Sequence, residues 1–105
     1  MFNLKKSGVE YSFHLELEDV IDKLDCLYLT RLQKERFGGD LVLDSYQLSL
    51  ANLKNAKPNL KIMHPLPRQN ELPVEIDNTP YAYYFTQAEN GLYVRQALLD
   101  ILFSI

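Results

Sequence analysis

Apolar and polar positions divide the first 30 residues into three short predicted elements. Alternation from Gly8 to His14 is typical of a strand. Apolar residues then recur at spacings of three and four across residues 17–24, which predicts an amphipathic helix. The continuous apolar run CLYLT at residues 26–30 predicts a buried parallel strand, with Cys26 as a small buried residue. Strand, helix and strand in this order form a right-handed βαβ unit.

The middle of the chain is interrupted by glycine and proline. Residues 31–44 are polar and contain a Gly-Gly pair, which predicts a loop. A short helix is expected over Ser49–Lys57, because Pro58 disfavours its continuation. Leu60–His64 predicts another strand, and the prolines that follow prevent regular structure.

The C-terminal part is dominated by one apolar helix. Pro80 suits the first position of a helix capped by Asn78 or Thr79. From Leu92 to Ile105 the chain is apolar except for a few polar side chains, so this helix must be buried on several sides. A sheet of about three strands cannot cover it. We therefore expect it to pack against a missing domain or another subunit.

Length and composition define the class of protein. A chain of 105 residues, 47% hydrophobic and 24% charged, fits one globular domain and is unlike disordered, collagenous or disulfide-rich chains. The single cysteine excludes an intrachain disulfide and favours a reducing, cytoplasmic setting. No stretch approaches the ~18 apolar residues of a membrane helix. The expected fold is α/β, with a small parallel sheet, flanking helices and a long C-terminal helix.

Charge is unevenly distributed along the chain. The net charge of −3 argues against nucleic acid as a partner. Residues 31–68 nevertheless carry seven Lys and Arg against three Asp and Glu, whereas both flanking thirds are acidic. This basic segment is either an unevenly charged solvated surface or an anion site for a small carboxylate or phosphate.

Arg31 and Gln33 follow directly on the predicted strand 26–30. Ligands of open α/β sheets bind beyond the carboxyl ends of the strands. An arginine and an amide on the same side of the chain can hold one carboxylate. The alternative interpretation is a charged surface loop.

A second candidate segment, HPLPR at residues 64–68, follows the next predicted strand and should lie at the same edge. Its prolines leave few N–H groups, so the rigid backbone can present carbonyl oxygens to a donor. His64 is either a packed or capping residue or a catalytic one. Arg68 either faces an anion or pairs with Glu71 or Glu75.

Several known signatures are missing from the chain. It contains no glycine-rich nucleotide loop, no cluster of ligands at metal spacing and no GxSxG elbow.

Three segments resemble the catalytic chain of aspartate carbamoyltransferase: YLTRLQKERF (28–37), KIMHPLPRQNEL (61–72) and TPYAYYFTQAENGLYVRQALL (79–99). The resemblance implies a Rossmann-like three-layer domain. It also implies transfer of the carbamoyl group from carbamoyl phosphate to L-aspartate in pyrimidine biosynthesis, without metal or cofactor. The enzyme would be cytoplasmic and trimeric. The sibling ornithine carbamoyltransferases usually have Cys after this His and lack the TRxQ motif.

By this resemblance, Arg31 and Gln33 bind the side-chain carboxylate of aspartate. The carbonyl groups of Pro65 and Leu66 orient the carbamoyl amide. The resemblance further implies that residues 34–44 form a mobile loop that closes over aspartate. Arg68 and Glu71 would brace the closed form by pairing with other parts of the enzyme. His64 does not match the family's carbonyl-polarising histidine, which belongs to the other domain.

The family's phosphate-binding Ser-Thr-Arg-Thr segment and its His-Pro-x-Gln segment are absent. The expected domain organisation is therefore that residues 1–105 form the C-terminal portion of the aspartate-binding domain, without the carbamoyl-phosphate domain. The leading hypothesis is a piece of the enzyme that is inactive alone. The alternatives are a non-catalytic interaction module on a full-length subunit and a stand-alone binder of small dicarboxylates.

Overall fold

The computed structural model describes residues 6–31 and 47–104 of the chain. Its centre is a two-stranded parallel sheet, formed by β1 (Cys26–Tyr28) and β2 (Lys61–Met63). Cys26 pairs with Lys61 and Tyr28 with Met63, so the two strands end together. The backbone N–H of Leu29 donates to the Met63 carbonyl at 2.9 Å and extends this pairing by one residue. The expected small parallel sheet is confirmed.

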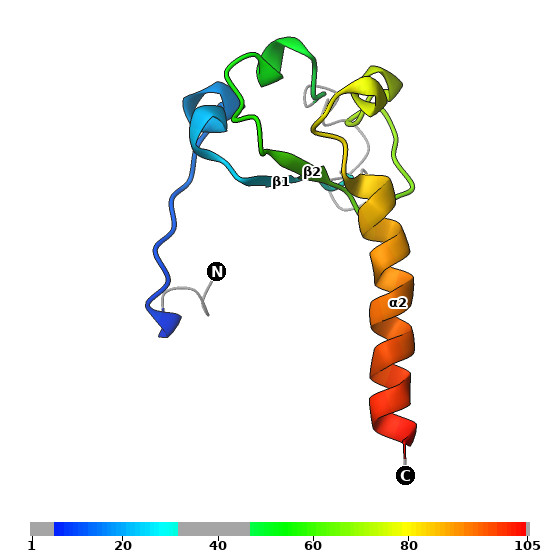
Figure 1. The fold of residues 1–105 in the computed structure, drawn as a ribbon. Helices are drawn as coiled ribbons and strands as arrows, with labels where there is room; N and C mark the ends of the chain where they lie inside the picture. The colour runs from blue at the N-terminus through cyan, green and yellow to red at the C-terminus, as the bar shows by residue number, and fades with distance from the viewer. Residues whose placement is uncertain (1–5, 32–46, 105) are drawn as a thin grey trace, which may run out of the picture.

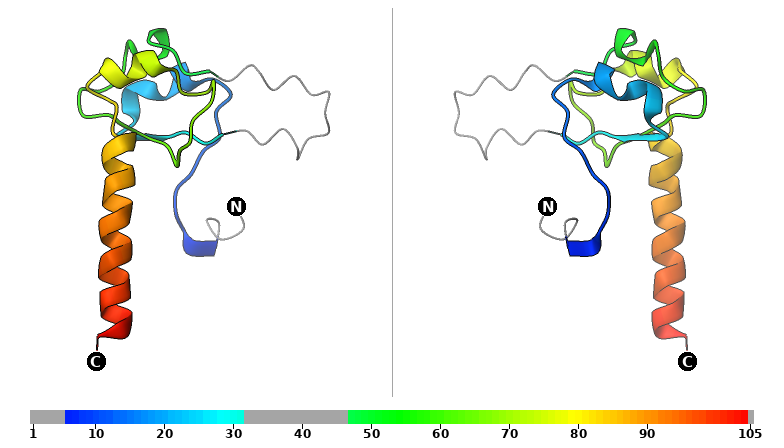
Figure 2. Two further views of the ribbon diagram at one scale, coloured as in Figure 1. Left: turned by 90° about the vertical axis from the view of Figure 1, so that its right-hand side faces the viewer. Right: turned by 90° about the vertical axis from the view of Figure 1, so that its left-hand side faces the viewer.

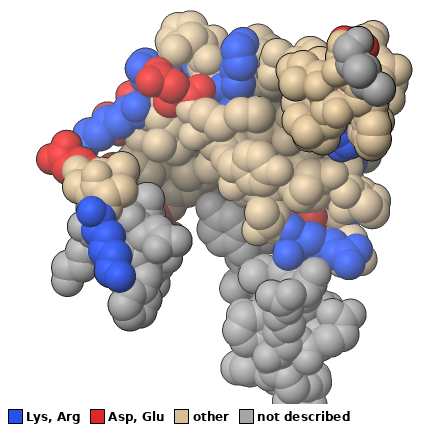
Figure 3. All heavy atoms as spheres, turned by 90° about the horizontal axis from the view of Figure 1, so that it is seen from below, with Lys and Arg blue, Asp and Glu red and all other residues tan. Residues whose placement is uncertain are grey.

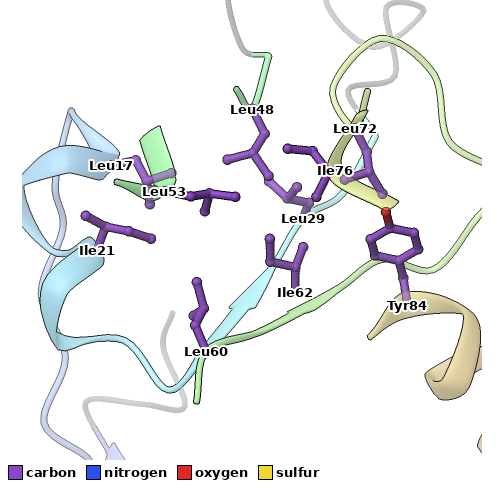
Figure 4. Packing of buried hydrophobic residues seen from close by; sticks show 10 residues of the cluster. All are labelled: Leu17, Ile21, Leu29, Leu48, Leu53, Leu60, Ile62, Leu72, Ile76 and Tyr84. Atoms are coloured by element: carbon purple, nitrogen blue, oxygen red, sulfur yellow. The ribbon is translucent and has the colours of Figure 1, made fainter. Parts of the chain in front are cut away.

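Short 3-10 helices lie above the sheet (Figure 1). They are η1 (Leu17–Asp19), η2 (Ile21–Lys23), η4 (Ala51–Leu53) and η5 (Val74–Asn78). Their apolar residues, with those of the strands and loops, form one core on this side of the sheet (Figure 4). Ile62 is fully buried near the middle of this cluster, and its neighbours are contributed by segments far apart in the sequence.

The long helix α2 (Tyr84–Phe103) extends away from this core as a rod (Figures 1 and 2). Only its first residue, Tyr84, is buried, and every described residue from Leu92 onward is exposed. The expected long C-terminal helix is thus confirmed, and its apolar side chains from Leu92 onward stay exposed within the described residues. No helix in residues 6–31 and 47–104 is long and apolar enough to cross a membrane.

Two predictions for the N-terminal third are wrong. Residues 8–14 form no strand in the described structure, because alternation describes side chains and a strand also needs a partner edge. The predicted helix over residues 17–24 is instead two 3-10 turns separated at Val20, whose φ is −130°. A helix of this length gains few i to i+4 hydrogen bonds to offset the cost of nucleation. The predicted βαβ unit is therefore absent from the described residues, although the parallel pairing is present.

Cys26 is exposed rather than buried. In β1 only the central residue, Leu27, is partly buried, because the described core covers one face of the sheet and strand side chains alternate between faces. The predicted helix over residues 49–57 is reduced to the single turn η4. There Ser49 and Asn52 exchange side-chain and backbone hydrogen bonds, which compete with helical pairing.

The helix start predicted at Pro80 is also wrong. The backbone N–H of Ile62 donates to the Tyr81 carbonyl at 2.8 Å, and that of Tyr83 donates to the Ile62 carbonyl at 3.0 Å. Ala82 therefore forms a parallel bridge with Ile62 and continues the sheet. The chain becomes helical only after this bridge, so Tyr81 and Tyr83 hydrogen-bond to β2 and α2 begins at Tyr84.

Truncation of Ile62 tests this description of the core. Ile62→Ala should lower the free energy of unfolding by about 2–5 kcal/mol, because it removes buried methyl groups and leaves a cavity. Urea unfolding of the chain, followed by circular dichroism, measures this change. Ile101→Ala is the matched control, since Ile101 is 73% exposed on α2 and its loss should change stability by less than about 0.5 kcal/mol. Equal losses in the two variants would contradict the fold.

Candidate functional site

An open pocket of about 370 Å³ lies at the carboxyl edge of the sheet. Thr30 and Arg31, which follow β1, line one part of it, and residues 64–67, which follow β2, line the rest. The parallel pairing brings these segments together, since the carboxyl ends of parallel strands meet at one edge. The sequence prediction that both segments lie at the same edge of the sheet is confirmed.

Arg31 is exposed at the pocket, and no hydrogen bond or ion pair joins it to another residue within 6–31 and 47–104. Its guanidinium group can therefore form two parallel hydrogen bonds with a carboxylate. Gln33 and the predicted mobile loop 34–44 lie outside the described residues. Of the four residues expected to bind substrate, the structure places Arg31, Pro65 and Leu66 around this pocket.

Residues 64–68, called the pocket loop below, have an uncommon backbone conformation. The Leu66–Pro67 peptide bond is cis, and Leu66 has a φ of 55°, in the left-handed region. A φ in this region costs an L-residue with a Cβ atom roughly 1–2 kcal/mol. The surrounding contacts must therefore hold Leu66 in place.

His64 provides one of these contacts. Its side chain is buried, and its Nδ1 accepts a hydrogen bond from the Leu66 N–H at 2.8 Å. Its Nε2 lies 2.8 Å from Oε1 of Glu71, which is also buried. The backbone N–H of His64 donates to Oε1 of Gln87 at 2.9 Å, which connects the loop to α2. The interpretation of His64 as a packed, capping residue agrees with these contacts.

The Glu71 carboxylate is held in its ionised form. Burial raises the pKa of Glu71, but hydrogen bonds from the backbone N–H groups of Glu71 and Gln69 and from His64 outweigh it, so the pKa lies below its usual value. The N–H of Gln69 contacts the same Oε1 atom at 3.2 Å. Glu71 is therefore engaged within the chain, and its pairing with other parts of a larger enzyme stays a prediction.

Arg68 pairs with Asp77, so the predicted partners Glu71 and Glu75 are wrong. Its guanidinium binds both carboxylate oxygens of Asp77, with Nη2 at 2.8 Å from Oδ2. The same guanidinium lies over the rings of Tyr84 and Phe85, at 5.7 and 5.6 Å from their centroids. This bidentate geometry is possible because η5 places Asp77 opposite the end of the pocket loop.

The hydroxyl of Tyr84 donates to the Asp77 carboxylate and completes a cluster of three side chains. The hydrogen bond from Arg68 keeps the pKa of Asp77 below its usual value. The sequence pattern did not predict Asp77, Tyr84 and Gln87 as supporting residues. Arg68 and Asp77 are nine residues apart, and His64 and Gln87 are 23 apart, so no local spacing indicated these contacts.

The family model that matches the chain is that of aspartate/ornithine carbamoyltransferase, Asp/Orn binding domain, over residues 2–102. The chain therefore belongs to the aspartate/ornithine carbamoyltransferase family and matches its amino-acid-binding domain. Nearly the whole chain contributes to this match.

Individual relatives agree with the family. The chain is 50% identical over 102 residues to the aspartate carbamoyltransferase catalytic subunit of Vibrio campbellii, covering 94% of this chain and 33% of the relative. It is 55% identical over 100 residues to that of Wigglesworthia glossinidia brevipalpis, covering 92% and 32%. The chain thus spans about a third of the length of these curated relatives.

Solved structures show the same fold. The aspartate transcarbamoylase of Trypanosoma cruzi, in complex with carbamoyl aspartate and phosphate, superposes with a TM-score of 0.75 at 37% identity. The match covers 94% of this chain and 30% of that protein. The same protein in complex with carbamoyl phosphate gives a TM-score of 0.78, with 93% and 33% covered.

The Tyr84 hydroxyl provides a direct test of the cluster that supports the loop. Burial, followed by the hydrogen bond to Asp77, raises the pKa of Tyr84 to about 12, above the ordinary value of 10.0. Because the folded chain retains this proton longer than the unfolded chain, the stabilisation is complete below pH 10 and is lost between about pH 10 and 12.

An ultraviolet absorbance titration of the seven tyrosines should therefore contain a late component near pH 12. Tyr84→Phe should remove this component. Tyr93→Phe, at an exposed position of α2, is the control and should leave it in place. A late component that persists in Tyr84→Phe would refute the assignment.

Proposed function

We propose that this chain supplies the aspartate-binding part of an aspartate carbamoyltransferase. In that reaction the α-amine of L-aspartate attacks the carbonyl carbon of carbamoyl phosphate, and phosphate leaves. The observation that carries the proposal is the pocket at the carboxyl edge, where Arg31 meets the backbone of Pro65 and Leu66. The curated relatives that match 94% and 92% of this chain are aspartate carbamoyltransferase catalytic subunits.

The chemistry of the pocket suits the two substrates. In this proposal Arg31 and Gln33 bind the side-chain carboxylate of aspartate, and the carbonyl groups of Pro65 and Leu66 accept hydrogen bonds from the carbamoyl amide. The fixed positions of these groups favour reaction chiefly by proximity and orientation, because no covalent intermediate with the protein is needed. Two side-chain pairs hold the pocket loop in place. Arg68 binds Asp77, and Glu71 accepts a hydrogen bond from His64.

The described part of the pocket has few cationic side chains that could bind a phosphate. Arg31 is the one Lys or Arg side chain among the described residues that line the pocket. If it binds the aspartate carboxylate, the phosphate of the second substrate needs cationic groups from elsewhere. We therefore propose that residues 1–105 form a C-terminal portion of the aspartate-binding domain and work together with a separate carbamoyl-phosphate-binding part.

Helix α2 offers a surface for that assembly. Val94, Ile101, Leu102 and Phe103 are each at least 66% exposed, and apolar side chains occur all around the helix. Seen from the end toward which α2 points, most of the described surface carries no charged side chains (Figure 3). Because the chain spans about a third of its relatives, the carbamoyl-phosphate-binding part is the proposed occupant of this surface. A cytoplasmic trimer of completed chains is the assembly that the resemblance implies.

The same helix also favours the second candidate function, a non-catalytic module that docks on a full-length subunit. In both candidate functions a partner covers α2, so association alone does not distinguish between them. The rate at which carbamoyl aspartate forms distinguishes the two candidate functions. A docking module would leave that rate unchanged, whereas the missing part of the active site would raise it.

The purified chain alone should form no carbamoyl aspartate from carbamoyl phosphate and aspartate. Addition of the part of the Vibrio campbellii subunit that this chain does not match should produce turnover, measured by a colorimetric assay for the ureido product. Turnover by the 105-residue chain alone would contradict the proposed division of the site. Absence of turnover in the assembled pair, with association demonstrated, would favour the docking module.

In the assembled pair, Arg31→Ala should raise the KM for aspartate by about 10- to 100-fold. A hydrogen bond to a charged group contributes about 1.5–3 kcal/mol, and 1.4 kcal/mol is a factor of ten. The KM for carbamoyl phosphate should change much less. Lys54→Ala removes an exposed positive charge outside the pocket and is the matched control. An equal loss for both substrates would count against the role of Arg31.

A further inference from the structure

His64 lines the pocket, yet the proposed function gives its side chain no contact with a substrate. Its exposed fraction is 1%, and both ring nitrogens are engaged inside the chain. A buried imidazole with two defined partners is fixed in orientation and in the position of its proton.

The contacts assign the tautomer. The backbone N–H of Leu66 can only donate, so Nδ1 of His64 carries a lone pair and no proton. The proton is therefore on Nε2, where it is donated to the Glu71 carboxylate at 2.8 Å. Glu71 is held in turn by the N–H of Gln69. The carboxylate thus keeps the imidazole in the one tautomer that can accept from Leu66.

The consequence lies in the backbone of residues 65–67. Pro65 and Pro67 have no N–H group, so Leu66 carries the single backbone donor of this segment. His64 occupies that donor. The segment therefore offers only carbonyl oxygens, and a group that approaches its backbone must donate hydrogen bonds. The same contact holds Leu66 at its left-handed φ of 55°, which its side chain disfavours.

We infer that His64 is a positioning residue for the substrate amide: it fixes the Leu66 backbone so that the pocket presents hydrogen-bond acceptors to a donor-bearing group. Glu71 acts one step further back, by setting the His64 tautomer. The identity of the positioned group as a carbamoyl amide rests on the proposed function. The positioning of Leu66 itself rests only on contacts within this chain.

Two amide variants separate the roles of the ring nitrogens. In His64→Asn the side-chain oxygen can replace Nδ1, because Asn commonly accepts from the N–H two residues further on. In His64→Gln the longer side chain can reach toward Glu71 in place of Nε2, but it provides no acceptor at the Nδ1 position. His64→Asn should therefore preserve the hydrogen bond to the Leu66 N–H and the loop conformation, and His64→Gln should lose both. The same two substitutions at His14, an exposed histidine whose Nε2 lies 2.8 Å from the Ser12 hydroxyl, serve as controls.

The first measurement uses the chain alone. Long-range nitrogen–proton NMR spectra should show His64 protonated on Nε2, and the Leu66 amide should exchange slowly with solvent. Exchange at Leu66 should be faster in His64→Gln and close to unchanged in His64→Asn. Protonation of His64 on Nδ1, or equal exchange in the two variants, would overturn the inference. If both variants fail to fold, the unmodified chain still provides the test, because the inference requires both the Nε2 proton and slow exchange of the Leu66 amide, and fast exchange would overturn it.

The second measurement uses the assembled pair. His64→Gln should lower kcat by about tenfold or more and change the KM for aspartate little, because a misplacement of about 1 Å can cost on the order of 100-fold in rate. His64→Asn should recover most of kcat. Equal kcat losses would show a merely structural role and overturn the positioning. If the unmodified pair makes no product, the proposed function fails, and the exchange comparison still decides whether His64 positions Leu66.

Discussion

The parallel pairing of β1 with β2 is the interaction on which the rest of the structure depends. The register from Cys26–Lys61 to Tyr28–Met63 makes the two strands end side by side, so that Arg31 and the loop after His64 meet at one pocket. The same strand β2 bonds to Tyr81 and Tyr83 on its other edge, which sets the point where α2 begins. A shift of β2 would separate the cation from the carbonyl oxygens and would also displace the helix.

Two polar clusters hold the pocket loop against this frame. His64, Glu71 and Gln69 fix its beginning, and Arg68, Asp77 and Tyr84 fix its end. The side chains of both clusters are partly or fully buried, apart from that of Gln69, which contributes its backbone N–H. An unpaired polar group would be costly there, so each of these buried side chains needs its partner. The loop can therefore keep a left-handed Leu66 without help from a ligand. In an enzyme that acts by orientation, such a rigid backbone is what the proposed chemistry requires.

The sequence predicted the elements that carry strong local signals, and it failed where distant contacts decide. β2, the parallel sheet and the long apolar helix followed from apolar runs and from the absence of proline in them. The helix near Leu17 and the strand near Tyr11 were wrong, because periodicity reports which side chains share a face and not which backbone hydrogen bonds form. Arg31, Pro65 and Leu66 could be placed together because they follow adjacent strands. Asp77 and Gln87 could not be found, since each reaches the loop only through the tertiary fold.

In the proposed function, this chain carries the aspartate half of a site that another polypeptide segment completes. A crystal structure of the assembled pair with N-(phosphonacetyl)-L-aspartate tests it most directly, since this compound joins an aspartate group to a phosphonate. A carboxylate of the ligand should bind the Arg31 guanidinium, and its phosphonate should bind cationic groups outside residues 1–105. A ligand bound away from Arg31, or a phosphonate held by this chain alone, would contradict the claim.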